Sequence, residues 1–443
     1  MAEEKIKIKK SKPIYRVGNL LIVITLHTTM ILWFLAKTDF WLEITSYPML
    51  LISQIASLFG MTLLSWSMLL SSRLHFVEYM FGGLDKVYAI HKKVSIYGIV
   101  LLIVHPITLA LMNFPDKIFN LKFFLPTNGQ LPLDVGIIGF WLFIILTVIT
   151  LYIKLTYERW RFTHKFYGLA LLFGYFHMLG TPSDTSIYPL LGYWMMAVGG
   201  TGLAAYIYIQ FFYKSLAAKY KYKVSKIVKK SDTYLVSFEP EGNKMKYNPG
   251  QFAYITYFDS EVKKEMHPFS ITSHVDENEL SFAIKILGDY TSSLDNLKIG
   301  DQAEIYGPYG RFSDKLSDDK DLIFIGGGVG VAPFVSMVKD AAKKNNGQWV
   351  SLYYCTKTKN DACLDIELTG VLGKIPDSFY INQCSDNQGR LSVDTVMKRV
   401  RKIDNTVVFL CGPHQMMNDY QKKLIEQGLK KDNIVMEDFS FGR

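Results

Sequence analysis

The sequence predicts a membrane-embedded α-helical bundle followed by a soluble module in which a small antiparallel β-barrel precedes a parallel α/β domain. Three observations predict this class of fold. Long uncharged runs occur only before about residue 213, strands of alternating polarity follow after about residue 220, and from residue 321 a buried strand leads through glycines into a helix. With 443 residues, of which 49% are apolar and 14% aromatic, the chain is too long for one ordinary domain and too apolar for a purely soluble one.

Six apolar runs define the expected membrane spans. They cover residues 17–36, 47–72, 94–114, 135–153, 166–180 and 186–213. A hydrocarbon core takes about 20 helical residues to cross. The fifth run is shorter, so we expect it to begin earlier, near Trp160, or to tilt little.

The distribution of lysine and arginine predicts the orientation of the bundle. Positive residues are retained on the cytoplasmic side. They are abundant in the amino-terminal segment and in the second and fourth loops, at Arg73, Lys86, Lys92, Lys93, Lys154, Arg159, Arg161 and Lys165. The opposite loops hold only Lys37, Lys117 and Lys122. We therefore expect a multi-pass protein of the plasma membrane with both termini in the cytoplasm, and no cleaved signal peptide, because the first apolar run has no small-residue cleavage site.

Net charge and cysteine usage narrow the functional class further. We attribute the formal net charge of +9 to basic loops that stay on the cytoplasmic side and contact anionic lipid. Nucleic-acid binding is a poor alternative explanation of this charge. Four cysteines all lie in the soluble half, without paired metal-ligand spacing, at Cys355, Cys363, Cys384 and Cys411. This usage predicts a reducing cytosol and no disulfides.

Four histidines fall in or beside the third and fifth apolar runs. An α-helix turns about 100° and rises about 1.5 Å per residue, so His91 and His105 lie within about 40° of one face and about 21 Å apart. His164 and His177 lie at matching depths. Ionisable residues inside spans are costly, and neutral imidazole is a good axial ligand for haem iron. We predict two b-type haems, one bound by His91 with His164 and the other by His105 with His177.

Two details bear on this interpretation. Any one of these histidines alone could instead be an interfacial or helix-bonding residue, and four at matched depths disfavour that alternative. His164 and His177 are thirteen positions apart, which places them about 140° out of phase on an ideal helix. Either the fifth helix is distorted, for which Gly168 and Gly174 offer sites, or His164 sits in its frayed first turn. His27 and His75 have no partner at matching depth and are expected to be structural.

The barrel segment carries a candidate site for a pyrophosphate and a planar ring system. The strands "TYLVSFEP" and "QFAYITYF" are separated by turn signals and precede "HPFSITS" at 267–273 and "FAIKILGDYTSSL" at 282–294. Main-chain groups with hydroxyls and a basic residue at such strand ends can bind a pyrophosphate, and Tyr254 and Phe269 could flank a planar ring system.

The last segment carries a candidate dinucleotide site. The run "DLIFIGGGVGVAPFVSMV" lets phosphates approach the backbone at a helix amino terminus. Alternating strand and helix units follow, with Cys411-Gly412-Pro413 at a late strand end. Together these features favour nucleotide binding, which the glycine-rich turn alone would indicate only weakly.

The assembled motifs resemble those of the NADPH oxidase and ferric reductase superfamily, in which a six-helix haem domain is fused to a ferredoxin-NADP reductase-like flavoprotein. The resemblance rests on the four histidines and on the motifs "FGGLDKVYAIHK", "HPFSITS", "GGGVGVAPF", "CGP" and the terminal "EDFSFGR". The chain lacks calcium-binding EF-hand loops and so resembles compact prokaryotic members. It departs from the animal oxidases at Leu109, where they have a second histidine near the outer haem.

The resemblance implies roles for individual residues. FAD contacts are implied for His267, Pro268, Phe269, Ser270, Thr272, Ser273, Lys285, Gly288, Tyr290, Thr291 and Ser292. The nicotinamide nucleotide would lie against Gly326, Gly327, Gly328, Gly330 and Pro333, with Cys411, Gly412 and Pro413 beside the reacting ring. Phe439 is expected to cover the flavin face that the nicotinamide must reach, with Phe441 as the alternative; both could instead only anchor the chain end.

The implied organisation has four parts. They are a cytoplasmic segment (1–16), a six-helix haem domain (17–213), an FAD-binding barrel (214–319) and an NAD(P)H-binding α/β domain (320–443). Electrons would pass from cytosolic NAD(P)H through FAD and two haems to an outer acceptor. NADPH is the expected donor, with NADH tolerated, because Lys357, Lys359 and Arg390 could bind a 2′-phosphate; they could equally be solvated surface charges.

The acceptor and two other functional classes stay open at this point. The short outer loops show no acidic or histidine cluster for a metal chelate, so dioxygen, giving superoxide, is the expected acceptor, and a ferric chelate is the alternative. A membrane-tethered flavoreductase that feeds a partner enzyme, or a transporter with a nucleotide-sensing domain, would account for parts of the sequence. No obligatory protein partner is evident.

Overall fold

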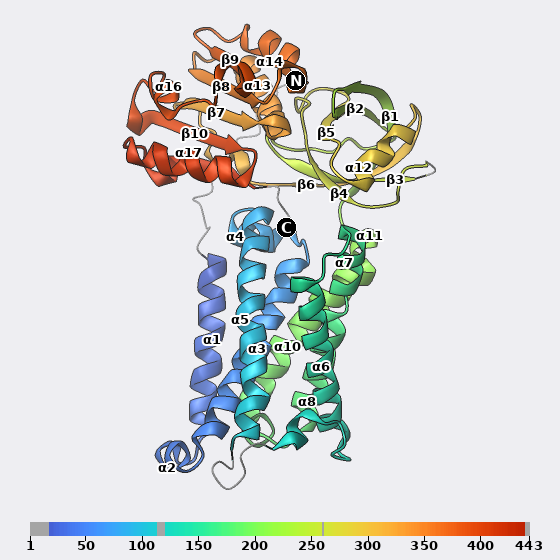
Figure 1. Ribbon diagram of the computed structural model, residues 1–443, viewed down its shortest axis with the longest axis vertical. Helices are drawn as coiled ribbons and strands as arrows, with labels where there is room; N and C mark the ends of the chain where they lie inside the picture. The colour runs from blue at the N-terminus through green and yellow to red at the C-terminus, as the bar shows by residue number, and fades with distance from the viewer. Residues whose placement is uncertain (1–16, 113–119, 259–260, 439–443) are drawn as a thin grey trace, which may run out of the picture. The chain divides into compact units, whose positions relative to one another are not determined.

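The computed structural model describes residues 17–112, 120–258 and 261–438. The chain divides into two compact units, a helical unit of Met1–Leu216 and a reductase unit of Ala217–Arg443 (Figure 1). Each unit has its own hydrophobic core.

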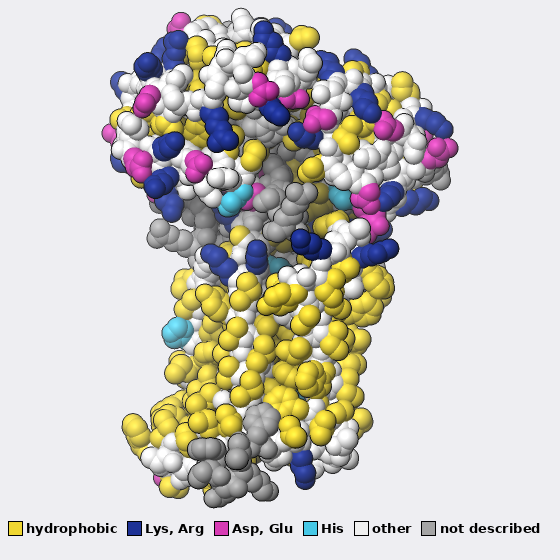
Figure 2. Space-filling model, in the orientation of Figure 1, with side chains coloured by type: hydrophobic (Ala, Val, Ile, Leu, Met, Phe, Trp, Pro, Cys, Tyr) yellow, Lys and Arg dark blue, Asp and Glu magenta, His cyan; other side chains and the backbone are white. Residues whose placement is uncertain are grey.

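The helical unit is built from long apolar helices joined by short ones. Its long helices are α1 (Val17–Leu35), α3 (Pro48–Ser71), α5 (Leu84–Ala110), α6 (Leu131–Tyr152), α8 (Tyr167–Gly180) and α10 (Pro189–Ile207). The short ones are α2 (Phe40–Ser46), α4 (His75–Phe81), η1 (Leu121–Phe124), α7 (Tyr157–His164), α9 (Asp184–Ile187), the π-turn η2 (Tyr208–Phe212) and α11 (Tyr213–Leu216). Hydrophobic side chains cover its visible flank in Figure 2, as expected for a surface in contact with lipid.

Five helices of the described residues are long and apolar enough to cross a membrane. They are Val17–Leu35, Pro48–Ser71, Leu84–Ala110, Leu131–Tyr152 and Pro189–Leu216. The remaining expected span, 166–180, corresponds to α8, whose 14 residues are fewer than the roughly 20 that a hydrocarbon core takes. A sixth span therefore stays a prediction.

Helix α3 is the most buried element of the helical unit and organises its packing. Helix α5 packs chiefly on α3, and α8 packs chiefly on α6. Small residues bring α3 and α10 close together, because a Cβ on Gly202 would lie 2.6 Å from the Ser65 Cα. Helices α5 and α8 thus pack against different helices, α5 against α3 and α8 against α6.

The reductase unit begins with the antiparallel barrel that the sequence predicts. Its sheet has the order β4-β3-β6-β1-β2-β5, and a bridge between Ile271 and Phe282 links its two ends. The strands are β1 (Lys219–Lys230), β2 (Thr233–Pro240), β3 (Phe252–Phe258), β4 (His267–Ser270), β5 (Leu280–Lys285) and β6 (Gln302–Tyr309). Buried aromatic side chains such as Tyr222, Phe238 and Tyr257 fill the barrel.

The parallel α/β domain is also confirmed. Its sheet has the order β11-β10-β7-β8-β9, with β7 (Asp321–Gly327), β8 (Val350–Thr356), β9 (Phe379–Cys384), β10 (Thr406–Cys411) and β11 (Ile434–Glu437). Its main helices are α13 (Ala332–Lys344), α14 (Asp365–Leu372), α16 (Val393–Met397) and α17 (His414–Glu426). Successive β7 residues alternate between two cores: Phe324 faces one, and Ile323 and Ile325 face the other. Charged side chains are frequent on the visible surface of this unit in Figure 2.

Candidate redox cofactor sites

The four histidines of the helical unit form two pairs. The ring centroids of His105 on α5 and His177 on α8 lie 6.4 Å apart, with the ring planes at 63°. Those of His91 on α5 and His164 at the end of α7 lie 6.3 Å apart, at 64°. We call these the 105/177 pair and the 91/164 pair. The two pairs therefore have nearly the same ring separation and nearly the same angle between ring planes.

The phase difference between His164 and His177 has a structural explanation. His164 is the last residue of α7, and α8 begins only at Tyr167. The two histidines therefore do not share one continuous helix, and the chain can turn between them. A short break, not a distortion at Gly168 or Gly174, brings each histidine opposite its partner on α5.

The 105/177 pair is oriented by hydrogen bonds to the ring Nδ1 atoms. The Nδ1 of His105 lies 3.1 Å from the Ser53 carbonyl oxygen and 2.7 Å from the Ser53 Oγ. The Nδ1 of His177 lies 3.1 Å from the Pro132 carbonyl oxygen and 3.2 Å from the Thr181 Oγ1. Because a carbonyl only accepts, Nδ1 must carry the hydrogen in both rings, and Nε2 keeps the lone pair that can bind a metal.

The 91/164 pair is oriented differently on its two sides. The Nδ1 of His91 lies 2.9 Å from the Ser67 carbonyl oxygen and 3.0 Å from the Ser67 Oγ. His164 stacks on Trp160 with ring centroids 4.8 Å apart and meets Tyr167 edge-on at 4.9 Å. Among the residues that the structure describes, its buried Nδ1 has no hydrogen-bond partner. His164 is thus oriented by aromatic packing.

Both pairs fit a haem iron. If two imidazoles bind one iron from opposite sides, with bonds of about 2 Å and ring centres about 1.1 Å behind each nitrogen, their centroids lie about 6.2 Å apart. The observed 6.3 and 6.4 Å match this spacing. No three His, Cys, Asp or Glu side chains gather as ligands anywhere in the described ranges. Two-histidine sites suit a metal that brings its own equatorial ligands better than a bare ion.

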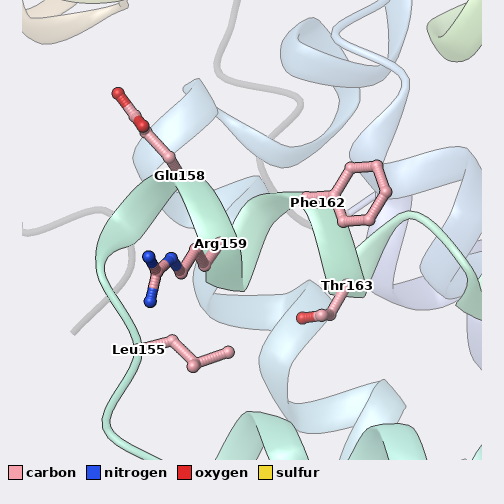
Figure 3. Close-up of a pocket in the computed structure, with 5 residues that line it drawn as sticks. All are labelled: Leu155, Glu158, Arg159, Phe162 and Thr163. Atoms are coloured by element: carbon pink, nitrogen blue, oxygen red, sulfur yellow. The ribbon is translucent and has the colours of Figure 1, made fainter.

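The helix α7 that carries His164 also borders a shallow hollow. It is lined by Leu155, Glu158, Arg159, Phe162 and Thr163 (Figure 3). Arg159 lies above Leu155 in Figure 3, and Arg159 and Phe162 are both exposed. A cation next to apolar side chains is typical of a helix at a membrane interface.

The candidate flavin residues gather around β4 and α12 (Asp289–Ser292). The His267 ring stacks on Tyr290 with centroids 3.9 Å apart and lies 2.8 Å from the Glu265 Oε2 through its Nε2. Phe269 lies nearly parallel to Tyr290 at 6.5 Å. Burial raises the pKa of the Tyr290 hydroxyl, which has no hydrogen-bond partner within the described chain. This buried, unpaired hydroxyl fits a site that a polar cofactor completes.

Several other residues that the resemblance assigns to FAD bond to their own loops. The Ser273 Oγ lies 2.9 Å from the Tyr247 hydroxyl and accepts from the Ser281 N–H. The Thr291 Oγ1 accepts from the Leu287 N–H at 2.6 Å, and the Ser292 hydroxyl donates to the Gly288 carbonyl. Lys285 pairs with Asp232, 3.0 Å away. Ser270 and Thr272 are buried, Tyr254 is buried on β3, and Pro268 pairs with it across the strands. Many of these residues therefore fix the conformation of the loops around the candidate flavin site.

The candidate nicotinamide site lies where the order of the parallel sheet reverses. Strand β7 ends at Gly327, and its neighbour β10 ends at Cys411, which pairs with Gly326. Ligands of such sheets bind in the crevice outside the carboxyl ends of strands at this point. Gly328 and Gly330 form the turn into α13, and Pro333 occupies its first turn. Cys411 is 1% exposed, so its thiol is closely enclosed at this edge.

Gly412 shows why this edge needs glycine. Its φ is +153°, and a Cβ there would lie 2.9 Å from the Met416 Cε and 3.0 Å from the Gly327 backbone nitrogen. Across the same gap, a Cβ on Gly330 would lie 2.6 Å from the Cys411 carbonyl oxygen. The two strand ends thus approach each other through bare backbone, which a dinucleotide can also approach closely.

The remaining expected site residues are peripheral or lie outside the described residues. Lys357 follows the end of β8, and Arg390 follows β9 and a short helical turn; both are exposed, as is Lys359. Phe439 and Phe441 lie outside the described residues. The preceding Asp438 has its Oδ2 2.6 Å from the Nδ1 of His414, at the start of α17. Asp438, the last residue of this described range, therefore lies beside the first residue of α17.

Three family models match successive parts of the chain. A ferric reductase-like transmembrane component matches residues 56–175, an FAD-binding domain matches residues 218–320, and an oxidoreductase NAD-binding domain matches residues 324–422. The chain has the architecture of the NADPH oxidase and ferric reductase superfamily. It is a membrane oxidoreductase with a ferric reductase-like domain and domains that bind FAD and NAD(P)H.

Individual relatives match about half to two thirds of the chain at low identity. The propane 2-monooxygenase reductase component of Rhodococcus jostii is 28% identical over 221 residues, 46% of this chain and 58% of that protein. Flavohemoprotein A of Dictyostelium discoideum is 26% identical over 321 residues, 62% of this chain and 78% of that protein. The chain thus spans about three fifths of the length of the propane 2-monooxygenase reductases that it matches.

Solved structures show similarity at low identity. A flavohemoglobin from Malassezia yamatoensis with bound FAD and heme covers 91% of this chain and 99% of its own, at 19% identity and a TM-score of 0.49. The FAD/NAD-binding domain of a nitric oxide dioxygenase from Vibrio cholerae covers 50% of this chain and 98% of its own, at 21% identity and a TM-score of 0.44.

Sequence reasoning about this superfamily member missed the residues that orient the histidines. They are Ser53, Ser67, Pro132, Trp160 and Thr181. One signal was available: Ser53 and Ser67 are fourteen residues apart, as are His91 and His105. On two packed antiparallel helices, this equal spacing repeats the same contact at both levels.

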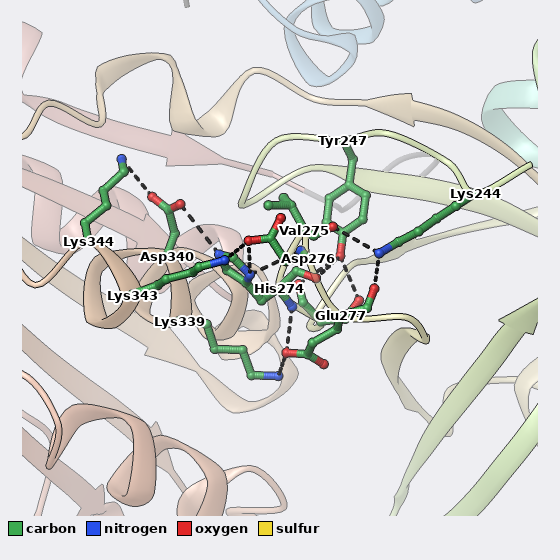
Figure 4. A network of polar contacts seen from close by, with 11 residues as sticks. Lys244, Tyr247, His274, Val275, Asp276, Glu277, Lys339, Asp340, Lys343 and Lys344 are labelled. Atoms are coloured by element: carbon green, nitrogen blue, oxygen red, sulfur yellow. Dashed lines mark hydrogen bonds and ion pairs between the residues drawn. The ribbon is translucent and has the colours of Figure 1, made fainter. Parts of the chain in front are cut away.

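A polar clamp that joins the barrel to the α/β domain was also missed (Figure 4). It connects the loop 274–277 to α13. Lys339 lies 3.0 Å from Glu277 and 2.7 Å from Glu367, and the His274 Nε2 lies 3.8 Å from Asp340. Burial alone would lower the pKa of Lys339, but the two glutamates outweigh it and raise that pKa. The clamp thus connects the barrel, which carries the candidate flavin residues, to the α/β domain, which carries the candidate nicotinamide residues.

Proposed function

We propose that the protein transfers electrons across a membrane, from cytosolic NAD(P)H through FAD and two b-type haems to dioxygen on the outer face, giving superoxide. The observation that carries this proposal is the pair of histidine couples with centroid separations of 6.3 and 6.4 Å. The matches to FAD-binding and NAD-binding domains support the donor side. Two stacked haem sites would serve little purpose in a reductase that only acted on soluble partners.

The proposed topology rests on the distribution of basic residues. The basic residues Arg73, Lys92 and Arg159 would face the cytoplasm together with both termini, which would put the 91/164 pair on the inner side and the 105/177 pair on the outer side. The same proposal assigns residues 17–213 to the haem domain, 214–319 to the FAD domain and 320–443 to the NAD(P)H domain.

Bound FAD and haem supply hydride acceptance and single-electron transfer, and the residues of this chain supply binding, orientation and exclusion of water. His91, His105, His164 and His177 would hold the irons through Nε2. His267, Phe269 and Tyr290 would border the flavin, and the polar residues from Ser270 to Ser273 and from Lys285 to Ser292 would bind or shape its phosphate site. Gly326 to Gly330 and Gly412 would admit the nicotinamide nucleotide beside Cys411, and Phe439 would cover the flavin face until the nucleotide arrives.

Dioxygen is proposed as the acceptor because a small neutral molecule needs no charged binding group. A ferric chelate is the alternative acceptor, favoured only by the match to a ferric reductase-like component. The match to a protein named as a monooxygenase reductase component favours a third candidate, a membrane-tethered flavoreductase that feeds a partner enzyme.

Reduction of cytochrome c by the purified protein in detergent distinguishes these acceptors. With NADPH as donor, we expect reporter reduction that superoxide dismutase suppresses. Reporter reduction that dismutase leaves unchanged would contradict superoxide formation. Faster NADPH consumption on adding ferric citrate, with no dismutase-sensitive signal, would favour the ferric reductase. His27→Ala protein should behave as the wild type does, because His27 bonds to Val23 of its own helix and belongs to neither pair.

A further inference from the structure

The serines of α3 repeat with the same spacing as the histidines of α5. Ser67 contacts His91, and Ser53 contacts His105, each through both its carbonyl oxygen and its Oγ. The Ser67 Oγ also contacts the Ser95 hydroxyl at 2.7 Å, and the Ser53 Oγ donates to the His105 carbonyl at 3.0 Å. Each serine of α3 therefore contacts α5 both at a candidate ligand ring and at a second polar group.

A carbonyl acceptor changes the chemistry of an imidazole that binds a metal. An Nδ1–H that donates to a carbonyl fixes the tautomer and makes the ring a more basic, more electron-rich ligand. Such a ligand stabilises the oxidised iron and lowers its reduction potential. An iron with two carbonyl-bonded histidines should therefore have a lower reduction potential than an iron with one.

The two pairs differ in this number. Both rings of the 105/177 pair donate to carbonyls, His105 to Ser53 and His177 to Pro132. In the 91/164 pair only His91 donates to a carbonyl, and the buried Nδ1 of His164 has no partner among the described residues. The helix break after His164 places Trp160 and Tyr167 against that ring where polar groups contact the other three.

We infer that this asymmetry orders the two haem potentials, so that the iron of the 91/164 pair is reduced more easily than the iron of the 105/177 pair. The inference rests on the proposed function, because it requires a haem at each pair. In each step one electron reduces an oxidised iron, and no proton is transferred. Electrons then collect on the 91/164 iron and move on when an acceptor withdraws them from the other. Ser53 and Ser67 are positioning residues in this scheme.

The order of potentials is measured by spectroelectrochemistry of the purified full-length protein. The wild type should show two one-electron waves, and His105→Ala should lose one haem and keep the wave of higher potential. A remaining wave at the lower potential would overturn the inference while leaving two haems in the wild type and the proposed function intact. A wild type without haem would overturn both.

A second variant tests the cause directly and does not depend on removing a ligand. Trp160→Gln places an amide oxygen one helical turn before His164, and Trp160→Phe is the matched control that keeps an aromatic ring without an acceptor. We expect Gln to lower the higher wave by about the 59 mV of a tenfold change in a one-electron equilibrium, and Phe to leave it nearly unchanged. Equal potentials in the two variants would overturn the inference, even if His105→Ala lost both haems.

Discussion

The helical unit and the reductase unit present their candidate sites in opposite ways. In the helical unit, four identical side chains from α5, α7 and α8 face each other in two pairs with nearly equal separations. In the reductase unit, many polar side chains near the flavin site bond to their own loops, and the nucleotide site is formed by glycine backbone. The difference teaches that the candidate site is built from paired side chains in one unit and largely from backbone shape in the other.

The largest expected effect follows from removing one ligand. His105→Ala should lower the rate of electron transfer to an outer acceptor about a hundredfold or more, because one iron would lose an axial ligand. Flavin reduction by NADPH should continue at the wild-type rate, since that site belongs to a separate unit. Stopped-flow flavin bleaching and the haem content per chain measure both effects. Two haems per chain in this variant would contradict the ligand assignment.

The next effect tests the backbone site in the reductase unit. Gly412→Ala places a methyl group 2.9 Å from the Met416 Cε at a φ of +153°, which an L-residue rarely adopts. We expect the KM for NADPH to rise about tenfold or more while haem content is unchanged.

Gly370→Ala is the matched control for this change. Gly370 lies in α14, and a Cβ there meets no atom within 4 Å. Alanine is favoured over glycine in a helix by roughly 1 kcal/mol, so this variant should be neutral or slightly more stable. An unchanged KM in Gly412→Ala would contradict the role of this strand edge.

A smaller effect distinguishes shaping residues from direct contacts. Ser273→Ala removes the hydroxyl that accepts from the Ser281 N–H and that is one of three partners of the Tyr247 hydroxyl. Loss of such buried bonds costs about 1 to 3 kcal/mol, so the melting temperature of the reductase unit should fall. Ser292→Ala, at an exposed position, should change stability by less than about 0.5 kcal/mol. Thermal unfolding with FAD in excess checks both, and equal melting temperatures would show that Ser273 does not shape the loop.

The sequence predicts the fold of the reductase unit more completely than the detailed geometry of the helical unit. Alternating strands and the glycine turn after "DLIFI" predict the barrel and the parallel sheet, because both patterns are local. The histidine pairs follow from the spacing of His91 and His105 together with the matching depths of His164 and His177. The break between His164 and Tyr167 could not be predicted, since a short polar run beside an apolar one does not show where a helix ends.

The orienting serines were hidden for a related reason. A serine in an apolar helix usually bonds to the carbonyl four residues earlier, as Ser65 does with Met61. Ser53 and Ser67 instead contact histidines 52 and 24 positions away. Only the register between α3 and α5 decides between these two behaviours, and that register is a property of the packed bundle.

The smallest expected effect concerns nucleotide preference. Lys357→Ala combined with Arg390→Ala should lower the NADPH to NADH ratio of kcat/KM by only a few-fold, because exposed charge pairs contribute about 0.2 to 1 kcal/mol each. The two residues are exposed beyond the ends of β8 and β9. Initial rates with both nucleotides measure the ratio. An unchanged ratio would show that neither side chain recognises the 2′-phosphate.

The haem content of the purified wild-type protein tests the central claim most directly. A reduced-minus-oxidised spectrum, calibrated by pyridine haemochrome and by released flavin, gives both cofactors per chain. The paired histidines predict two b-type haems for each FAD. A spectrum of flavin alone, from protein expressed with sufficient haem supply, would contradict the account and leave a membrane-tethered flavoreductase.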